Sequence, residues 1–188
     1  SEAIYGSGKH YKIVFGVILG SGVGGGLVID KKIVSGPHGI TGEWGHNQLP
    51  LNVDNFNNDT KNLRDGEIEI FISGLSLSKM FKNNFKKDLN AQQIFELFRK
   101  NDLDAKKTIE QFKKNLSLGI ASVVNILDPD AFIFGGGLSN EIDFFDEIQS
   151  NGRKFVAGNE FEGVFLKPKY GDASGVRGAA RLGRRVSY

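Results

Sequence analysis

The stretch FGVILGSGVGGGLVIDKKIVSGPHGITGEWGH, from Phe15 to His46, contains most of the information about the fold. It begins inside Ile13–Leu19, whose β-branched and aromatic residues are apolar on both faces of an extended chain and predict a buried strand. A glycine-rich run, Gly20–Gly26, ends that strand, and a second strand with a hairpin is expected over residues 27–34. The rest of the stretch is a loop that ends in the tight turn Glu43-Trp44-Gly45-His46.

The glycine run has the composition of a phosphate-binding loop. Without Cβ atoms, successive backbone amides can reach phosphate oxygens, and Ser21 adds a hydroxyl donor. The spacing is neither a P-loop, which needs a lysine, nor a dinucleotide-binding fingerprint, which needs a helix directly after the strand. The alternative is a glycine-rich hairpin without a ligand, and the residues alone leave the two interpretations open.

Glu43 and His46 form a second candidate site. A carboxylate and an imidazole three residues apart on a tight turn can accept and donate hydrogen bonds to neighbouring sugar hydroxyls, with Trp44 as their support. Glu69, in a helix predicted over residues 67–72, could add a second carboxylate. The structural alternatives are a hydrogen-bonded surface turn and a solvated acid in a first helical turn.

The remainder of the chain alternates between helical and strand patterns. An exposed, asparagine-rich loop is expected over residues 51–65. Further helices are predicted over residues 91–101, 105–127, from a cap at Ser139 or Asn140 through Ile148, and 175–186, and further strands over residues 131–134 and 164–166. This alternation predicts layers of helices and strands, of the α/β or α+β class.

A third candidate site, which is the second glycine cluster, follows the strand predicted over residues 131–134. Gly135, Gly136 and Gly137 stand where that strand ends, and in open α/β sheets ligands bind beyond the carboxyl ends of strands. Glycines there would admit a flat base such as adenine, whereas the alternative is an ordinary tight turn. Three such loops in one small chain favour a site that brings a phosphate donor to a polyol.

The composition of the 188 residues excludes several classes of partner and site. The net charge is +2 with acids and bases interspersed, so no nucleic-acid or lipid-binding surface is expected. There is no cysteine, which excludes disulfides and thiolate metal sites. Without an apolar run long enough to span a bilayer, we expect a cytoplasmic protein. The opening residues, SEAIYG, resemble the last turn of a helix, and we expect the chain to be a fragment.

Five sequence blocks, taken together, resemble the ROK family of bacterial sugar kinases and repressors, especially its fructokinase/mannokinase branch. They are GVILGSGVGGGLVI, GITGEWGHNQLP, EIFISG, NILDPDAFIFGGGLSN and GDASGVRGAA, in that order, and they span essentially the whole chain. The resemblance implies an α/β, actin-like ATPase fold of the ribonuclease H type. Residues 1–173 would form the larger, C-terminal lobe of a two-lobe kinase, and residues 174–188 a terminal helix that packs on the N-terminal lobe.

The same resemblance implies ligands and the residues that hold them. ATP with Mg²⁺ and a hexose are the expected ligands, no membrane or nucleic-acid partner is expected, and the family's dimerisation through this lobe makes a homodimer a further expectation. The matching residues are Gly20, Ser21, Gly22 and Gly24 for phosphate, Gly135, Gly136 and Gly137 for adenosine, and Glu43, His46 and Glu69 for the sugar.

The chain departs from the family pattern in two places that concern the chemistry. Thr60, Asn62 and Glu67 stand where the family's zinc loop has cysteines, and oxygen ligands make a poor tetrahedral zinc site, so zinc is not expected. The first phosphate motif and the catalytic aspartate are expected upstream of Ser1, so the chain would contain no catalytic residue and would be inactive alone.

The parent protein is therefore expected to phosphorylate a hexose with ATP, with fructose as the first choice of substrate and mannose, glucose or N-acetylglucosamine next. Two alternatives from other classes stay open. One is the sugar-sensing lobe of a ROK transcriptional regulator, and the other is a non-catalytic binding domain. Sequence upstream of Ser1 would distinguish them, because a regulator carries an additional basic helical domain there.

Overall fold

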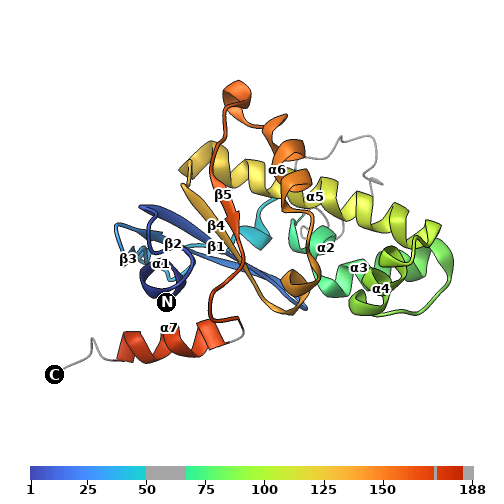
Figure 1. The fold of residues 1–188 in the computed structure, drawn as a ribbon, viewed down its shortest axis with the longest axis horizontal. Coiled ribbons are helices and arrows are strands. Elements are labelled where there is room, and N and C mark those ends of the chain that lie inside the picture. The colour runs from blue at the N-terminus through green and yellow to red at the C-terminus, as the bar shows by residue number, and fades with distance from the viewer. Residues whose placement is uncertain (50–66, 172, 184–188) are drawn as a thin grey trace.

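The structure is a computed structural model that describes residues 1–49, 67–171 and 173–183. The exposed loop predicted over residues 51–65 lies outside the described residues. The described residues form a five-stranded sheet with the strand order β3-β2-β1-β4-β5 (Figure 1). The strands are β1 (Ile13–Leu19), β2 (Val23–Ile29), β3 (Lys32–Ile33), β4 (Ala131–Gly135) and β5 (Val164–Leu166). β2 is antiparallel to β1 and β3, whereas β4 is parallel to β1 and β5.

The predicted strands are confirmed, but β2 is longer than its sequence suggests. It begins at Val23 and not at Leu27, because the ladder with β1 continues to the pair Leu19 and Val23. Three of the glycines therefore lie within a strand, and the turn between β1 and β2 is confined to Gly20–Gly22. The prediction of a glycine loop over the whole of Gly20–Gly26 was wrong in this respect.

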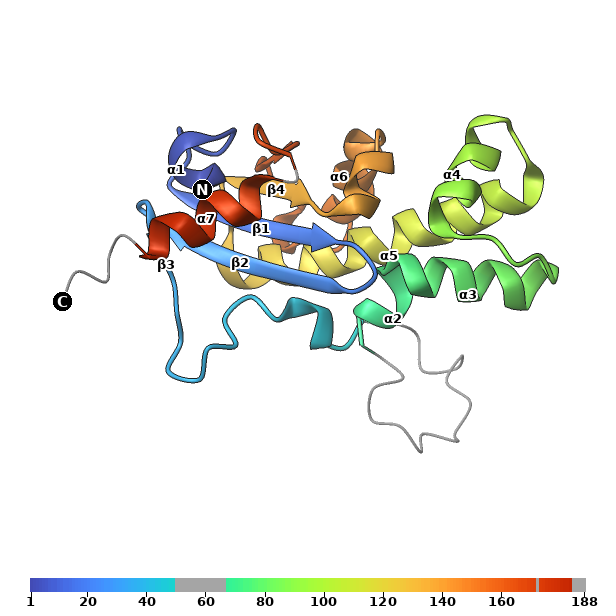
Figure 2. The same cartoon turned by 90° about the horizontal axis from the view of Figure 1, so that it is seen from below.

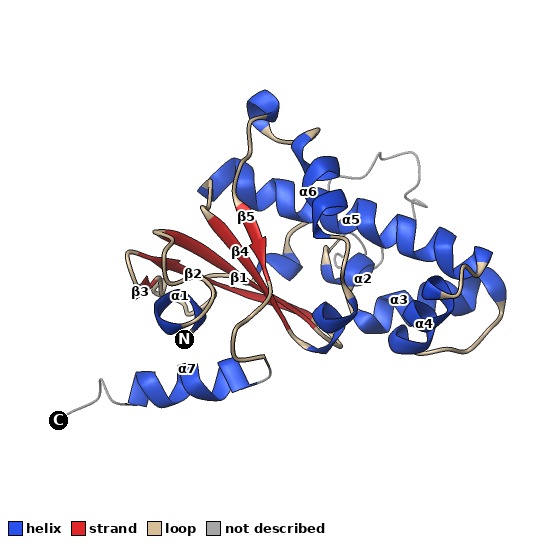
Figure 3. Ribbon diagram, in the orientation of Figure 1, coloured by secondary structure: helices blue, strands red, loops and turns tan. Residues whose placement is uncertain are grey.

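The helices cover the sheet and extend beyond one end of it (Figures 2 and 3). They are α1 (Glu2–Tyr5), α2 (Glu69–Ile72), α3 (Gly74–Phe85), α4 (Ala91–Arg99), α5 (Leu103–Leu127), α6 (Phe145–Arg153) and α7 (Ala173–Gly183), with short 3₁₀ turns η1 (Trp44–His46), η3 (Gly137–Glu141) and η4 (Ala157–Asn159). None of the helices in the described part of the chain is long and apolar enough to cross a membrane.

The long helix α5 organises the core. Asp102 caps it by accepting a hydrogen bond from the amide of Ala105, at 2.9 Å. Its apolar side recurs every three to four residues and is completely or almost completely buried, as at Phe112, Leu116 and Ile120. α2, α3, α4 and α6 all pack on α5, with α3 and α4 at the end of the molecule away from α1 and α7 (Figure 2).

One helical prediction was wrong, and one helix was missed. Ser139 or Asn140 was expected to cap a helix, but the chain forms the turn η3 there and α6 begins only at Phe145. The hydroxyl of Ser139 donates to the carbonyl of Gly135 at 2.6 Å, so it holds the turn against β4 and does not cap a helix. Helix α3 was missed, although Ser73 caps it and Leu77 and Phe81 bury one side of it.

The two ends of the described chain are joined through the side chain of Glu2. Its carboxylate accepts hydrogen bonds from the amides of Ser7, Lys169 and Tyr170, each at 3.0 Å, and from the hydroxyl of Ser174 at 2.6 Å. α7 is therefore held at its beginning by α1. Burial by itself raises the pKa of Glu2, but these hydrogen bonds together outweigh burial and leave the pKa below its usual value.

The variant Glu2→Gln tests this contact through stability. We expect a loss of about 1–3 kcal/mol at pH 7, because an amide offers one acceptor oxygen and sets its NH₂ group against donors. Since folding lowers the pKa of Glu2, its contribution is complete above the unfolded value of about 4.3 and is lost as pH falls through the folded value. Urea unfolding should therefore show a difference in stability between variant and wild type at pH 7 that narrows as the pH falls below about 4.3 and closes below the folded pKa of Glu2. A difference in stability that is equal at pH 7 and at acidic pH would contradict this explanation. Glu96→Gln, at an exposed site, is the control.

Candidate functional site

The turn between β1 and β2 is held from two sides. The amide of Gly20 donates to the carbonyl of Gly22 within the turn, at 2.9 Å. From outside, the amide of Gly74 at the start of α3 donates to the carbonyl of Gly20 at 2.8 Å, and the carboxylate of Glu69 accepts from the amide of Val23 at 2.7 Å. Within the described residues no partner is found for the amides of Ser21 and Gly22, so these two are available to a ligand.

A cavity of about 460 Å³ opens beside this turn. The two glycine clusters meet there, because Gly20 and Ser21 line it on one side and Gly137 on the other. The remaining walls come from residues that the sequence did not single out: Gly74, Leu75, Ser78, Asn90, Ala91, Gln92, Leu138 and Glu141. The wall residues from α3 could have been predicted from the sequence, because Ser73 is a typical helix cap and precedes apolar residues at helical spacing.

The three glycines after β4 have different surroundings. Gly135 is the last residue of β4, and Gly136 has φ +88° with its missing Cβ directed at the carbonyl oxygen of Leu19, 2.4 Å away. Any side chain at 136 would collide with the backbone of β1. Only Gly137 of the three lines the cavity, and it has open space where a Cβ would stand.

The Glu43–His46 turn packs on the first residues of β2, close to the tip of the hairpin. Trp44 is 3 % exposed, its indole Nε1 donates to the carbonyl of Gly24 at 2.8 Å, and its ring meets the edge of Phe15. A Cβ at Gly25 would stand 2.8 Å from the Trp44 ring, so this glycine permits the close packing. Gly24 and Gly25 therefore hold the turn against β2, whereas Gly20–Gly22 form the tip of the hairpin.

Glu43 and His46 project from this turn into the solvent. Their side chains are about half exposed, and Nε2 of His46 lies 3.9 Å from Oε2 of Glu43. Both residues line a cavity of about 700 Å³ between the loop of residues 39–47 and the last turns of α5. The structure thus brings together the two residues that were predicted to bind sugar hydroxyls.

Glu69 does not line that cavity. One of its carboxylate oxygens is engaged with the amide of Val23, which links α2 to the tip of the hairpin. Its neighbour Glu67 was singled out only as a replacement for a zinc ligand. Oε2 of Glu67 lies 3.1 Å from Nδ1 of His46, a hydrogen-bonding contact.

The described residues contain no group of three or more histidines, cysteines and acids that could hold a metal ion. Thr60 and Asn62 lie outside the described residues. His46 and Glu67 offer nitrogen and hard oxygen ligands without a thiolate, which is an unfavourable donor set for a structural zinc site.

The ROK family model matches residues 1–186. The chain belongs to the ROK family. It is 35% identical over 180 residues to the N-acetyl-D-glucosamine kinase of Yersinia enterocolitica, covering 93% of this chain and 59% of that protein. The chain thus spans about three-fifths of the length of this curated relative.

Solved structures confirm the predicted actin-like fold. A ROK family glucokinase from Streptomyces griseus, in complex with glucose and AMPPNP, superposes with a TM-score of 0.80 at 26% identity, over 98% of this chain and 64% of that one. A ROK family transcriptional regulator, a homologue of the E. coli MLC protein, superposes equally well at 19% identity, over 97% of this chain and 48% of that one. The second match concerns the fold alone.

Replacing Glu69 with alanine tests the link between α2 and the hairpin tip. A charge-assisted hydrogen bond of this kind contributes about 1.5–3 kcal/mol, so the amide of Val23 should exchange with solvent at least about tenfold faster in the variant. Hydrogen exchange followed by NMR measures this directly. The control is Glu96→Ala, which removes an exposed carboxylate from α4. Unchanged exchange at Val23 in Glu69→Ala would show that the contact does not hold the tip.

Proposed function

We propose that this chain is the larger lobe of an ATP-dependent hexose kinase that acts in the cytoplasm. The observation that supports this most strongly is the double role of the β1–β2 hairpin. Its tip leaves the amides of Ser21 and Gly22 open beside a cavity, and its second strand seats the turn that carries Glu43 and His46. One hairpin would thereby hold the phosphate donor and the acceptor sugar next to each other.

The amides and hydroxyl at the tip would bind phosphate oxygens of ATP, and Gly137 with the first residues of α3 and α4 would accommodate its adenosine. Mg²⁺ would bridge the phosphates and offset the charge that develops during phosphoryl transfer. Glu43 and His46 would orient the sugar, with the second carboxylate oxygen of Glu69 as a further contact. Residues 1–173 would be the lobe itself, residues 174–188 would pack on the N-terminal lobe, and that lobe would supply the aspartate that removes the hydroxyl proton.

The choice of sugar changes in the light of the curated relatives. Fructose was the first choice from the sequence blocks, but the relatives at 32–35% identity are N-acetyl-D-glucosamine kinases. We therefore place N-acetylglucosamine first, ahead of glucose, mannose and fructose. The chain covers about three-fifths of these proteins, so we propose the activity for a protein that contains these 188 residues and not for the 188 residues alone.

A sugar-sensing regulator is the second candidate, because the fold of this chain matches a ROK transcriptional regulator as well as it matches a kinase. In that case the same cavities would bind sugar without phosphoryl transfer. A kinase turns over ATP in the presence of the sugar, whereas a regulator binds DNA in a sugar-dependent manner.

The decisive assay uses the full-length gene product with Mg-ATP and a panel of hexoses. We expect N-acetylglucosamine to give the highest kcat/KM, and Glu43→Gln to lower it roughly 100-fold by weakening the contact with a sugar hydroxyl. Glu162→Gln, far from the site and exposed, is the matched control. Absence of phosphoryl transfer to every hexose, together with sugar-dependent DNA binding, would establish the regulator instead.

A further inference from the structure

Glu67 contacts the imidazole of His46 at Nδ1, the ring nitrogen away from Glu43. Its Oε2 lies 3.1 Å from Nδ1, and the Glu67 side chain is only 13% exposed, whereas those of His46 and Glu43 are about half exposed. The three side chains thus form a row from the interior to the solvent: Glu67, then His46, then Glu43. Glu67 is the most enclosed of the three side chains, and its contact with the half-exposed ring contributes about one ordinary hydrogen bond.

The position of Glu67 is fixed by backbone contacts to the same turn. Glu67 forms an isolated antiparallel bridge with Gln48, and the amide of Ile68 donates to the carbonyl of Asn47 at 2.8 Å. Ile68 itself is completely buried. Because these contacts join Glu67 and Ile68 to the two residues that follow His46, the fold holds the carboxylate beside the ring.

The chemistry of the two groups determines which ring nitrogen carries the proton. An ionised carboxylate can only accept hydrogen bonds, so the contact requires a hydrogen on Nδ1 of His46. In the neutral ring Nε2 then has no hydrogen and is an acceptor. Oε2 of Glu43 is 3.9 Å from Nε2, too far for a hydrogen bond, and leaves Nε2 available to a ligand.

We propose that Glu67 is a positioning residue that holds His46 in the tautomer with hydrogen on Nδ1, so that Nε2 accepts a hydrogen bond from the substrate. An imidazole in water mainly carries its proton on Nε2, so the tautomer is a property that this contact confers. The assignment of the tautomer stands on the geometry alone, and only its use for the sugar rests on the proposed function.

The class of ligand follows from the two acceptors that face the solvent. Nε2 of His46 and the carboxylate of Glu43 both accept, so a ligand that binds both must present two donors side by side. Neighbouring hydroxyl groups of a sugar ring meet this requirement, whereas a phosphate or a carboxylate ligand would be repelled. The pair thus selects a neutral diol over an already phosphorylated position.

The tautomer is measured by long-range ¹H–¹⁵N NMR of the 188-residue chain with labelled histidine. The chain contains three histidines, so His10 and His38 serve as internal references, and His46→Gln assigns the third. The spectra are recorded over a pH series and the neutral form is taken at the upper plateau. We expect a protonated Nδ1 and an unprotonated Nε2 at His46, and a wild-type ring with its proton on Nε2 would overturn the proposal.

The variant Glu67→Ala removes the acceptor. The ratio of the Nδ1–H to the Nε2–H form of His46 should fall about five- to tenfold, the equivalent of one hydrogen bond, while His10 and His38 stay unchanged. Fluorescence of Trp44, the single tryptophan, checks that the turn is intact. An unchanged ratio in a folded variant would overturn the proposal. So would stoichiometric zinc in the purified protein with a His46 spectrum that changes on chelation.

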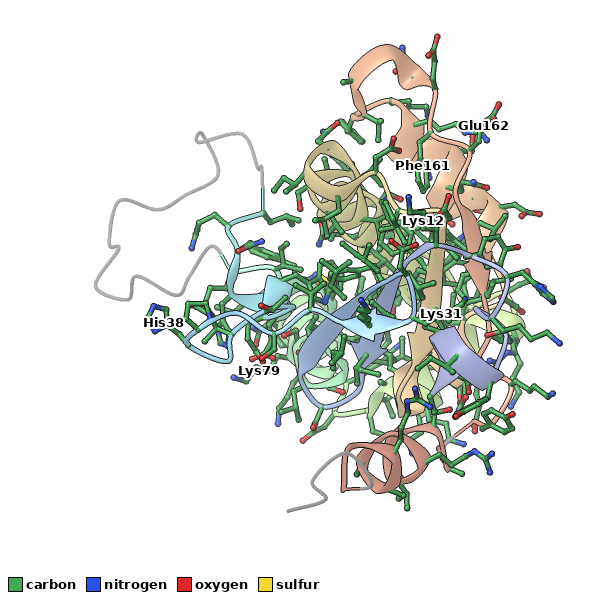
Figure 4. The ribbon with its side chains drawn as sticks, turned by 90° about the vertical axis from the view of Figure 1, so that its left-hand side faces the viewer. Lys12, Lys31, His38, Lys79, Phe161 and Glu162 are labelled. Atoms are coloured by element: carbon green, nitrogen blue, oxygen red, sulfur yellow. The ribbon has the colours of Figure 1, made fainter. Side chains whose placement is uncertain are left out.

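Glu162→Ala is the matched control, because Glu162 is an exposed glutamate on the other side of the molecule from the loop that carries His38 (Figure 4). It should leave all three histidine spectra unchanged.

Kinetics of the full-length protein test whether this tautomer of His46 contributes to sugar binding. Glu67→Ala should raise KM for the sugar about tenfold and leave KM for ATP within about twofold. An equal rise of both constants would show a merely structural role and contradict positioning. If the full-length wild type phosphorylates no hexose, the proposed function fails, and the tautomer measurement still decides whether Glu67 fixes His46.

Discussion

The contact on which the candidate site depends is the hydrogen bond from the amide of Val23 to the carboxylate of Glu69. It closes β2 at its first residue, and with the bond from Gly74 to Gly20 it fixes a turn of only three residues between two long strands. A glycine turn without such contacts would sample many conformations, because glycine loses more backbone freedom on folding than other residues. With the turn fixed by α2 and α3, the open amides of Ser21 and Gly22 keep one orientation, which electrostatic binding of phosphate requires.

The same strand then carries a different constraint a few residues later. Gly25 has no side chain and lets the ring of Trp44 approach β2, and the indole hydrogen bond to Gly24 fixes the turn that presents Glu43 and His46. The two halves of one glycine-rich run therefore have different physical roles. At the tip, glycine leaves the backbone amides accessible to a ligand. Within the strand, glycine lets the neighbouring turn pack closely against the backbone of β2. A single hairpin sets the distance between the two candidate subsites.

The sequence predicted those parts of the fold that depend on local periodicity. The strands β1, β4 and β5 and the long helix α5 were predicted correctly, because the apolar pattern of each matches its element. The extent of β2 was wrong, since glycine has low strand propensity and the ladder that pairs Gly24–Gly26 with β1, a contact between two strands, determines it. The cap at Ser139 was wrong for a local reason, because its hydroxyl donates to the carbonyl of Gly135 four residues earlier.

The individual motifs of the candidate site were predictable from the sequence, but the contacts between them were not. The glycine clusters and the Glu43–His46 turn stood out by residue type. That Gly20 and Gly137 line one cavity follows from the parallel pairing of β1 with β4, which the spacing alone does not reveal. The contacts of Glu69 with Val23 and of Glu67 with His46 cross between segments far apart in the chain, and no local pattern indicates them.

Binding of nucleotide phosphates at the tip of the β1–β2 hairpin can be measured by NMR. The ¹⁵N-labelled 188-residue chain is titrated with Mg-ATP at up to millimolar concentration and the backbone amides are followed. We expect the chemical shifts of the Ser21, Gly22 and Gly137 amides to change together with one apparent affinity, while the chemical shifts of the α7 amides do not change. Shifts confined to other surfaces, or an unchanged Ser21 and Gly22 at saturation of other signals, would contradict it.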